Sequence, residues 1–188
     1  RSYVMFLDTD SVLGLPVTCN SLFDEQGRVY LGYWGFEHHQ QYVRMCEDMV
    51  GDCVGSFMSY FPFVVPLSTL APLRAHIAAR IGQADFDSAF LAWSQKVGKE
   101  VAYFGFSQFV LMGNYLTNHF PSLVHPVYCP PYADAEGSEC AKWVPPAAHY
   151  GWIYCYYVDD PSCPDPDRYM VKEPGEFRGR LSSKFSAK

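Results

Sequence analysis

Residues 3–12 have the sequence YVMFLDTDSV, in which five apolar side chains lead to two carboxylates separated by one residue. The apolar run, residues 3–7, is typical of a buried strand in a parallel sheet. Ligand sites in open α/β sheets lie at the carboxyl ends of strands, so Asp8 and Asp10 can face one crevice. Mg²⁺ and Mn²⁺ take carboxylate oxygens and bridge them to substrate phosphates. The stretch therefore predicts a metal-assisted phosphate site, and its alternative is a solvated acidic turn.

Beyond this stretch, segments with the patterns of strands and helices alternate along the chain. We expect extended segments at 28–33, 56–65, 101–104 and 150–158, and helices at 38–50, 67–81, about 85–97 and 107–119. The expected helix N-caps are Ser68 or Thr69, Asp85 or Asp87, and Ser107. Asp24 and Gly27 supply a turn before the second strand. This alternation favours an α/β fold, with a less regular proline- and cysteine-rich part from residue 125 onward.

Composition limits the classes of protein to which the chain can belong. Its 188 residues are 49% apolar and 18% charged, which allows one domain with a sizeable core. Residues 1–167 hold 8 basic and 18 acidic residues, an acidic balance that argues against a nucleic-acid groove. Residues 168–188 hold 6 basic and 2 acidic residues, and we interpret them as a basic tail or linker. No apolar run is long enough to form a membrane segment.

The seven cysteines leave the compartment open. None of them forms a CxxC pair, which disfavours a zinc ribbon or a thioredoxin-type site. Four of them lie in the last third of the chain among prolines. Disulfides there would indicate the secretory pathway, in the Golgi or endoplasmic reticulum lumen, whereas free thiols would indicate the cytoplasm.

Two chemistries suit the carboxylate pair. In a nucleotide-sugar transferase, Asp8 and Asp10 would hold a metal under the diphosphate. In a haloacid-dehalogenase-type phosphatase, Asp8 would attack phosphorus and Asp10 would act as acid and base, with Asp159-Asp160 as a later acidic motif. The phosphatase also needs a lysine near the phosphate, and the lysines before residue 168 are Lys96, Lys99 and Lys142.

Three stretches resemble DxD glycosyltransferases of the GT-A fold. They are residues 3–13, with LFDEQGR downstream, the segment FMSYFPFVV at 57–65, and FSQFVLMGNYL at 106–116. The sequence is most similar to the glycosyltransferase-like proteins found with polysaccharide synthesis. This resemblance covers most of residues 3–120 and implies a Rossmann-type mixed sheet flanked by helices. It also implies that residues 1–167 are part of a GT-A-like domain, whose nucleotide-binding strands we expect upstream of Arg1.

The resemblance further implies a metal site. Asp8 and Asp10 would bind Mn²⁺ or Mg²⁺, and a late histidine, here His149, would complete the metal shell. Neutral imidazole is a reasonable third ligand, and His125 is the second choice. The alternative for His149 is an ordinary loop histidine.

On the acceptor side, the resemblance implies roles for Ser59 and Tyr60 in the second stretch and for Ser107 at the start of the third. Gln108 occupies the position of a family acid, and an amide cannot accept the proton that a general base takes. Trp34 follows a strand and stands beside a glycine, which makes it the better candidate for stacking on a sugar. The alternative for the many aromatic residues is a place in the core.

The sequence thus predicts a metal-dependent glycosyltransferase that moves a sugar from a nucleotide-sugar donor to a glycan or another hydroxyl acceptor. One alternative is the phosphatase described above. The other is a carbohydrate-binding domain that keeps the fold without the chemistry, which the amide of Gln108 favours.

Overall fold

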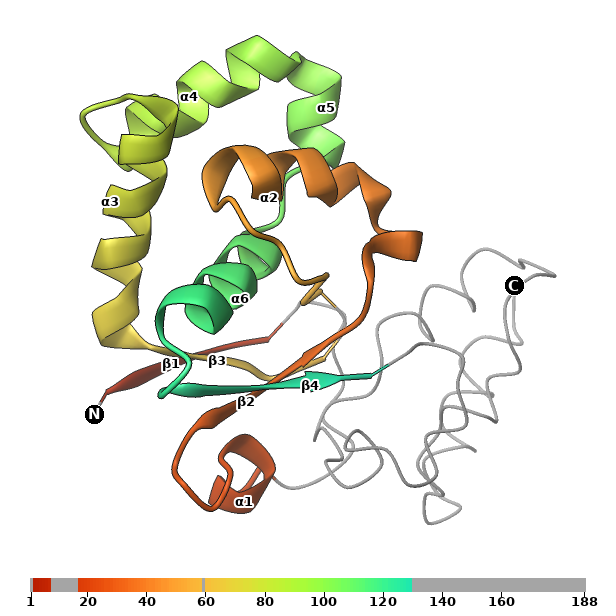
Figure 1. The fold of residues 1–188 in the computed structure, drawn as a ribbon, viewed down its shortest axis with the longest axis vertical. Helices are drawn as coiled ribbons and strands as arrows, with labels where there is room; N and C mark the ends of the chain where they lie inside the picture. Colours follow the sequence, from red (N-terminus) through yellow and green to blue (C-terminus); the bar gives the residue numbers. More distant parts are fainter. Residues whose placement is uncertain (1, 8–16, 59, 130–188) are drawn as a thin grey trace, which may run out of the picture.

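The computed structural model describes residues 2–7, 17–58 and 60–129 (Figure 1). These residues form a mixed α/β structure with small sheets, which confirms the expected α/β class. The strands are β1 (Tyr3–Phe6), β2 (Val29–Tyr33), β3 (Phe63–Pro66) and β4 (Val124–Tyr128). The helices are α1 (Cys19–Leu22), α2 (Val43–Met49), α3 (Leu70–Ile81), α4 (Phe86–Val97), α5 (Lys99–Phe104) and α6 (Gln108–His119), with short 3₁₀ turns η1 (Phe36–His38), η2 (Gln40–Tyr42) and η3 (Leu67–Thr69). The expected strand at 150–158 and the basic tail lie outside the described residues.

The four strands form two pairs, of which one is antiparallel and the other is parallel. β1 runs antiparallel to β3, with Phe6 opposite Phe63, and β2 runs parallel to β4, with Leu31 opposite Pro126. β2 also contacts β3, and Figure 1 shows the four strands together beneath α6. In the described residues the strands therefore form two small sheets, rather than the single Rossmann-type mixed sheet that the resemblance implies.

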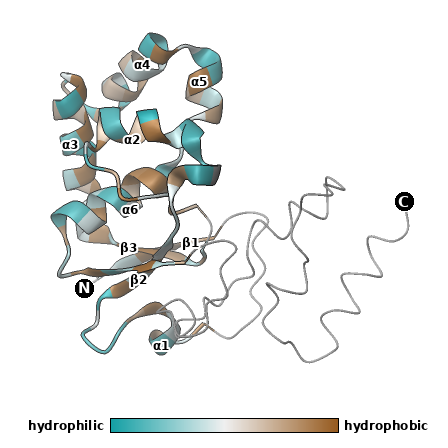
Figure 2. Cartoon of the chain, turned by 45° about the vertical axis from the view of Figure 1, so that its right-hand side comes forward, coloured by the Kyte–Doolittle hydropathy of each residue, from teal (hydrophilic) through white to brown (hydrophobic). Residues whose placement is uncertain are grey.

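Helix α6 is the centre of the described structure. Its residues 109–116 are all buried. Figure 2 shows this hydrophobic helix between the strands below and α2 above. A helix covered on opposite sides has no polar stripe, which explains its nearly continuous apolar run. The expected N-cap is confirmed, because the Ser107 hydroxyl accepts a hydrogen bond from the backbone N–H of Val110 at 3.3 Å.

The other helices largely follow the sequence expectations. Asp85 caps α4 by accepting a hydrogen bond from the Ser88 amide at 2.8 Å, and Gly98 ends this helix. The expected helix at 67–81 is η3 followed by α3. The expected cap by Thr69 is wrong, since its hydroxyl donates to the Pro66 carbonyl at 2.7 Å instead. The helix expected from residue 38 becomes regular only at Val43.

One expected strand is a helix. Residues 101–104 belong to α5, which packs against α4 at a corner formed by Gly98, with φ of +87°. A run of four apolar residues is too short to show a period, so the sequence alone does not distinguish a strand from a helix here.

Three extended segments also differ from expectation. β1 is half-exposed and antiparallel to its described neighbour, rather than buried and parallel, and Met5 is 48% exposed. β3 covers only the last part of the expected segment 56–65. β4 lies in the proline-rich part, where we expected irregular structure. Pro126 has no N–H to donate, but a strand paired on one side in the described structure tolerates this.

The described cysteines include both disulfide-bonded residues and a free thiol, which bears on the expected cellular compartment. Cys46 of α2 and Cys53 form a disulfide with a Cα–Cα distance of 6.1 Å, and Cys129 is disulfide-bonded as well, whereas Cys19 is a free, exposed thiol. These bonds are compatible with the secretory alternative. Among the described helices, none combines the length and hydropathy that crossing a bilayer requires.

Candidate functional site

The three sequence stretches that carry the resemblance converge on one side chain, Phe109 in the first turn of α6. Its ring centroid lies 6.3 Å from that of Phe6, the last residue of β1. It lies 5.1 Å from Phe61 and 5.4 Å from Phe63, at the start of β3. The carboxyl end of β1, the amino end of β3 and the amino end of α6 are therefore neighbours. We call this region the Phe109 junction.

Several candidate site residues lie outside the described residues. Asp8, Asp10, Ser59 and His149 are among them, so their side chains are not located. β1 ends at Phe6 in contact with Phe109, and Asp8 follows two residues later in the chain. The described part of this segment therefore ends next to the Phe109 junction, and Asp8 and Asp10 follow it in the sequence.

The candidates at the start of α6 have different surroundings. Ser107 is 1% exposed, and its hydroxyl caps the helix and contacts the Met58 sulfur. The side chain of Gln108 is exposed at the N-terminus of α6. Of these two residues, only Gln108 presents its polar group to solvent. Ser107 acts in the described structure as the N-cap of α6.

The two aromatic candidates are buried rather than open to solvent. Trp34 and Tyr60 are each 7% exposed, and their ring centroids lie 6.4 Å apart. The Tyr60 hydroxyl donates to the Cys129 carbonyl at 3.0 Å. Their burial reduces the ring area that could stack on a sugar, and agrees better with the core alternative.

The third stretch contains a buried polar residue to which the sequence analysis gave no role. Asn114 of α6 is fully buried, and its side-chain oxygen accepts hydrogen bonds from the amides of Val54 and Gly55 at 2.7 and 3.3 Å. Its side-chain amide donates to the carbonyls of Gly55 and Val110, both at 2.8 Å. Asn114 therefore fastens the loop before Phe57 to the central helix. The sequence does offer a signal for this role, because Asn114 is the one amide side chain within the apolar residues 109–116 of α6.

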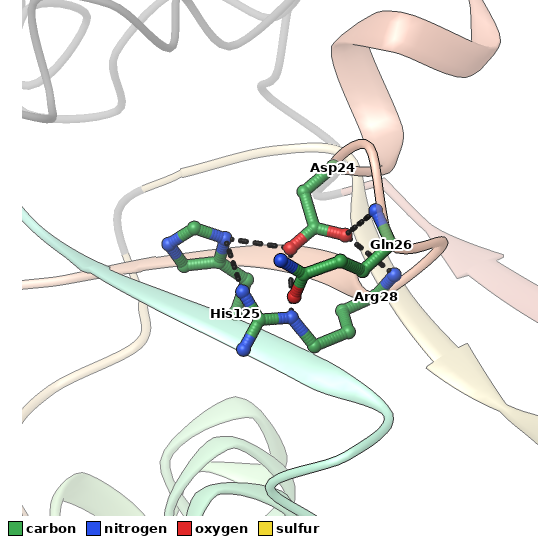
Figure 3. Close-up of polar contacts among 4 residues, drawn as sticks. All are labelled: Asp24, Gln26, Arg28 and His125. Atoms are coloured by element: carbon green, nitrogen blue, oxygen red, sulfur yellow. Dashed lines mark hydrogen bonds and ion pairs between the residues drawn. The ribbon is translucent and has the colours of Figure 1, made fainter.

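A second polar cluster joins the start of β2 to β4 (Figure 3). The carboxylate of Asp24 is 6% exposed and accepts hydrogen bonds from the Arg28 guanidinium at 2.7 Å and from the amides of Gln26 and Arg28. Nδ1 of His125 lies 2.9 Å from the same carboxylate. The same nitrogen lies 3.3 Å from Nη2 of Arg28. Nδ1 can therefore donate to Asp24 in one tautomer or accept from Arg28 in the other, and in both it is engaged within this cluster. The expected turn at Asp24 and Gly27 is confirmed. No local sequence pattern predicted that Asp24 would also pair with His125.

Electrostatics in this cluster favour the ionised acid. Burial opposes ionisation of Asp24, but the hydrogen bonds from Arg28, His125 and Gln26 outweigh it and lower the pKa of Asp24 from 3.8 to about 2. The carboxylate is therefore charged throughout the physiological range, which suits a structural role better than proton transfer near neutral pH.

We expect the Asp24 cluster to stabilise the fold in a pH-dependent way. The folded pKa lies below the unfolded one, so the contribution is complete above about pH 4 and disappears as the pH falls through 2. It amounts to about 2 kcal/mol. Asp24→Asn should lower the free energy of unfolding by that amount at neutral pH and by little at the acid end, as measured by urea unfolding across this range. Glu25→Gln, an exposed neighbour in the same turn, is the control, and an equal loss in both variants would contradict the assignment.

No family model, curated protein or solved structure matches the chain. Within residues 2–7, 17–58 and 60–129, no group of three or more histidine, cysteine or acidic side chains is arranged to hold a metal ion.

Proposed function

We propose that this protein is a metal-dependent glycosyltransferase domain with a GT-A-like fold. Asp8 and Asp10 would bind Mn²⁺ or Mg²⁺, with His149 as a third ligand. The bound cation would supply positive charge to a nucleotide-sugar diphosphate as it departs. The acceptor would be a glycan or another hydroxyl compound.

The observation that carries this proposal is the Phe109 junction. Three stretches of the chain resemble one enzyme family and lie far apart in the sequence. They meet around the ring of Phe109. The amino end of α6 lies beside the carboxyl end of β1, and helix N-termini favour negative charge. A diphosphate held by the carboxylates after β1 would therefore lie near a favourable dipole. Fixed charges of this kind stabilise a departing anion without covalent chemistry.

The phosphatase alternative has less support. It needs a lysine close to the phosphate, but the lysines in the described structure are on α4 and α5. Lys96 lies 3.9 Å from Asp48 of α2, and Lys99 begins α5. Neither of them belongs to the elements that meet at the Phe109 junction. Lys142 lies outside the described residues.

The alternative of a carbohydrate-binding domain without transfer rests on Gln108. Its exposed amide stands at the amino end of α6. The resemblance of this stretch to GT-A enzymes implies an acid at that position. If that acid is the base that activates the acceptor, inverting transfer would need another group. Donor binding would then persist without turnover.

The deciding experiment is calorimetry of the natural chain containing this sequence, with Mn²⁺ and a panel of nucleotide sugars. We expect donor binding that requires the metal and weakens at least about tenfold in Asp8→Asn and Asp10→Asn, since each variant loses a charged ligand. Asp52→Asn, an exposed carboxylate, is the matched control. Absence of metal-dependent nucleotide binding would refute the proposal, as would turnover of an aryl phosphate that disappears in Asp8→Asn.

A further inference from the structure

A cleft on the helical side of the molecule lies between α2, α3 and α4. Its volume is about 370 Å³, at the lower end of the size range of small-molecule sites. Side chains from all three helices line it, among them Glu47, Asp48, Arg80, Trp93 and Lys96. We call it the three-helix cleft, and none of these residues belongs to the Phe109 junction.

Hydrogen bonds hold two sides of the cleft in place. Arg80 donates to the carbonyls of Glu47 and Asp48 at 2.9 and 3.3 Å, so the guanidinium covers the C-terminal end of α2. The indole N–H of Trp93 donates to the Asp48 carboxylate at 3.0 Å. The ring itself is 1% exposed, so Trp93 supplies a rigid wall rather than a stacking face.

Charges of both signs line the cleft. Glu47 and Asp48 provide two carboxylates, and Arg80 and Lys96 provide two cations. The Lys96 side chain is 65% exposed, and its ammonium lies 3.9 Å from the Asp48 carboxylate, a separation longer than a hydrogen bond. Lys96 thus retains donors for a ligand.

This pattern selects a class of ligand. An anion would meet two carboxylates, a cation would meet two cations, and an apolar molecule would cover charged groups without offering them a hydrogen bond. A neutral molecule with several hydroxyls can donate to the carboxylates and accept from the cations, in charge-assisted bonds. A zwitterion also suits the charges, but the hydroxyl compound agrees with the proposed acceptor.

We propose that the three-helix cleft binds a neutral sugar residue of an acceptor glycan, separately from the donor site. The choice of a sugar rests on the proposed function, whereas the cleft and its charges do not. The glycan would be held through Glu47 and Asp48 on one helix and Lys96 on another. Binding here would increase the affinity for long acceptors over short ones without entering the chemistry.

The test uses the indole N–H of Trp93 as a reporter, because it is bonded to a carboxylate of the cleft. The full chain is labelled with ¹⁵N, the resonance is assigned through Trp93→Phe, and neutral mono- and oligosaccharides are titrated in. We expect a saturable shift of this resonance. Glu47→Gln and Lys96→Met should each weaken binding about tenfold, because each loses a charge-assisted hydrogen bond. Lys99→Met, an exposed lysine three residues further on, should leave it unchanged.

The outcomes separate this proposal from the transferase proposal. No shift with any neutral saccharide, or equal weakening in Lys99→Met, overturns the sugar site. A shift with zwitterionic amino acids but not with sugars also overturns it. Binding of nucleotide sugar with Mn²⁺ is measured on the same variants and should be unaffected by Lys96→Met. Loss of donor binding in Asp8→Asn with sugar binding at the cleft intact supports both proposals, whereas sugar binding without any donor binding supports the cleft alone.

Discussion

Replacing Asn114 with alanine should lower the free energy of unfolding by about 3 kcal/mol. The side chain is fully buried and makes four hydrogen bonds, two accepted from Val54 and Gly55 and two donated to Gly55 and Val110. Truncation leaves the Val54 and Gly55 amides and the Gly55 carbonyl without this partner, and each buried group left unpaired costs about 1–3 kcal/mol. Partial access of water to the loop keeps the total below the sum.

A nearby asparagine provides the control. Asn118 lies one turn further along α6, is exposed, and makes one side-chain hydrogen bond, to the Asp52 carbonyl at 2.6 Å. Asn118→Ala should cost less than about 1 kcal/mol. Urea unfolding with the Cys46–Cys53 disulfide intact measures both variants. Equal losses would contradict the claim that Asn114 anchors the loop. Asn114→Asp tests the donors separately, since a carboxylate can accept from the amides but cannot donate to the two carbonyls.

The sequence was most informative where local chemistry decides the structure. Asp85 and Ser107 are N-caps as expected, because a side-chain oxygen next to the first turn has the helix amides within reach. Gly82, with φ of +77°, follows α3, which ends at the expected residue 81, since glycine adopts the left-handed conformation at little cost. The turn at Asp24 was also expected, because an aspartate that bonds to amides further along the chain makes the turn by itself.

Sequence reasoning failed where distant partners decide. Residues 101–104 carry an apolar pattern as suitable for a strand as for α5, and packing against α4 selects the helix. β4 was missed because Pro126 argues against a strand unless the neighbour is known, and the neighbour, β2, is about a hundred residues away in the chain. The pairing of Asp24 with His125 was unpredictable for the same reason.

The candidate site was predictable only in part. The resemblance selected three stretches, and periodicity placed Ser107 at the start of a helix. The sequence could not show that Phe6, Phe61 and Phe109 touch, because aromatic side chains carry no information about their partners. The sequence also could not show that Gly113 and Asn114 are buried and support the fold, whereas Gln108 in the same stretch faces solvent. Only burial makes that distinction.

Gly113→Ala should lower the free energy of unfolding by about 2 kcal/mol, although alanine is the better helix former. A Cβ built at Gly113 would lie 2.2 Å from Cγ of the Phe57 ring, and Phe57 is fully buried. The ring cannot swing away, because it also stacks on Tyr33 with centroids 5.3 Å apart. The clash therefore outweighs the gain of about 1 kcal/mol that alanine brings to a helix interior.

A double-mutant cycle isolates this contact. Phe57→Leu removes ring atoms close to the added methyl group, so Gly113→Ala should cost much less in that background than in the natural sequence. We expect a coupling of about 1–2 kcal/mol, measured by urea unfolding of the four proteins. Additive effects would contradict the close approach of helix and ring. A positive result would assign Gly113 to the packing of α6 against the segment before β3, which keeps Phe109 at the junction of β1, β3 and α6. Conservation of this glycine in a related protein would then indicate that packing, rather than contact with a substrate.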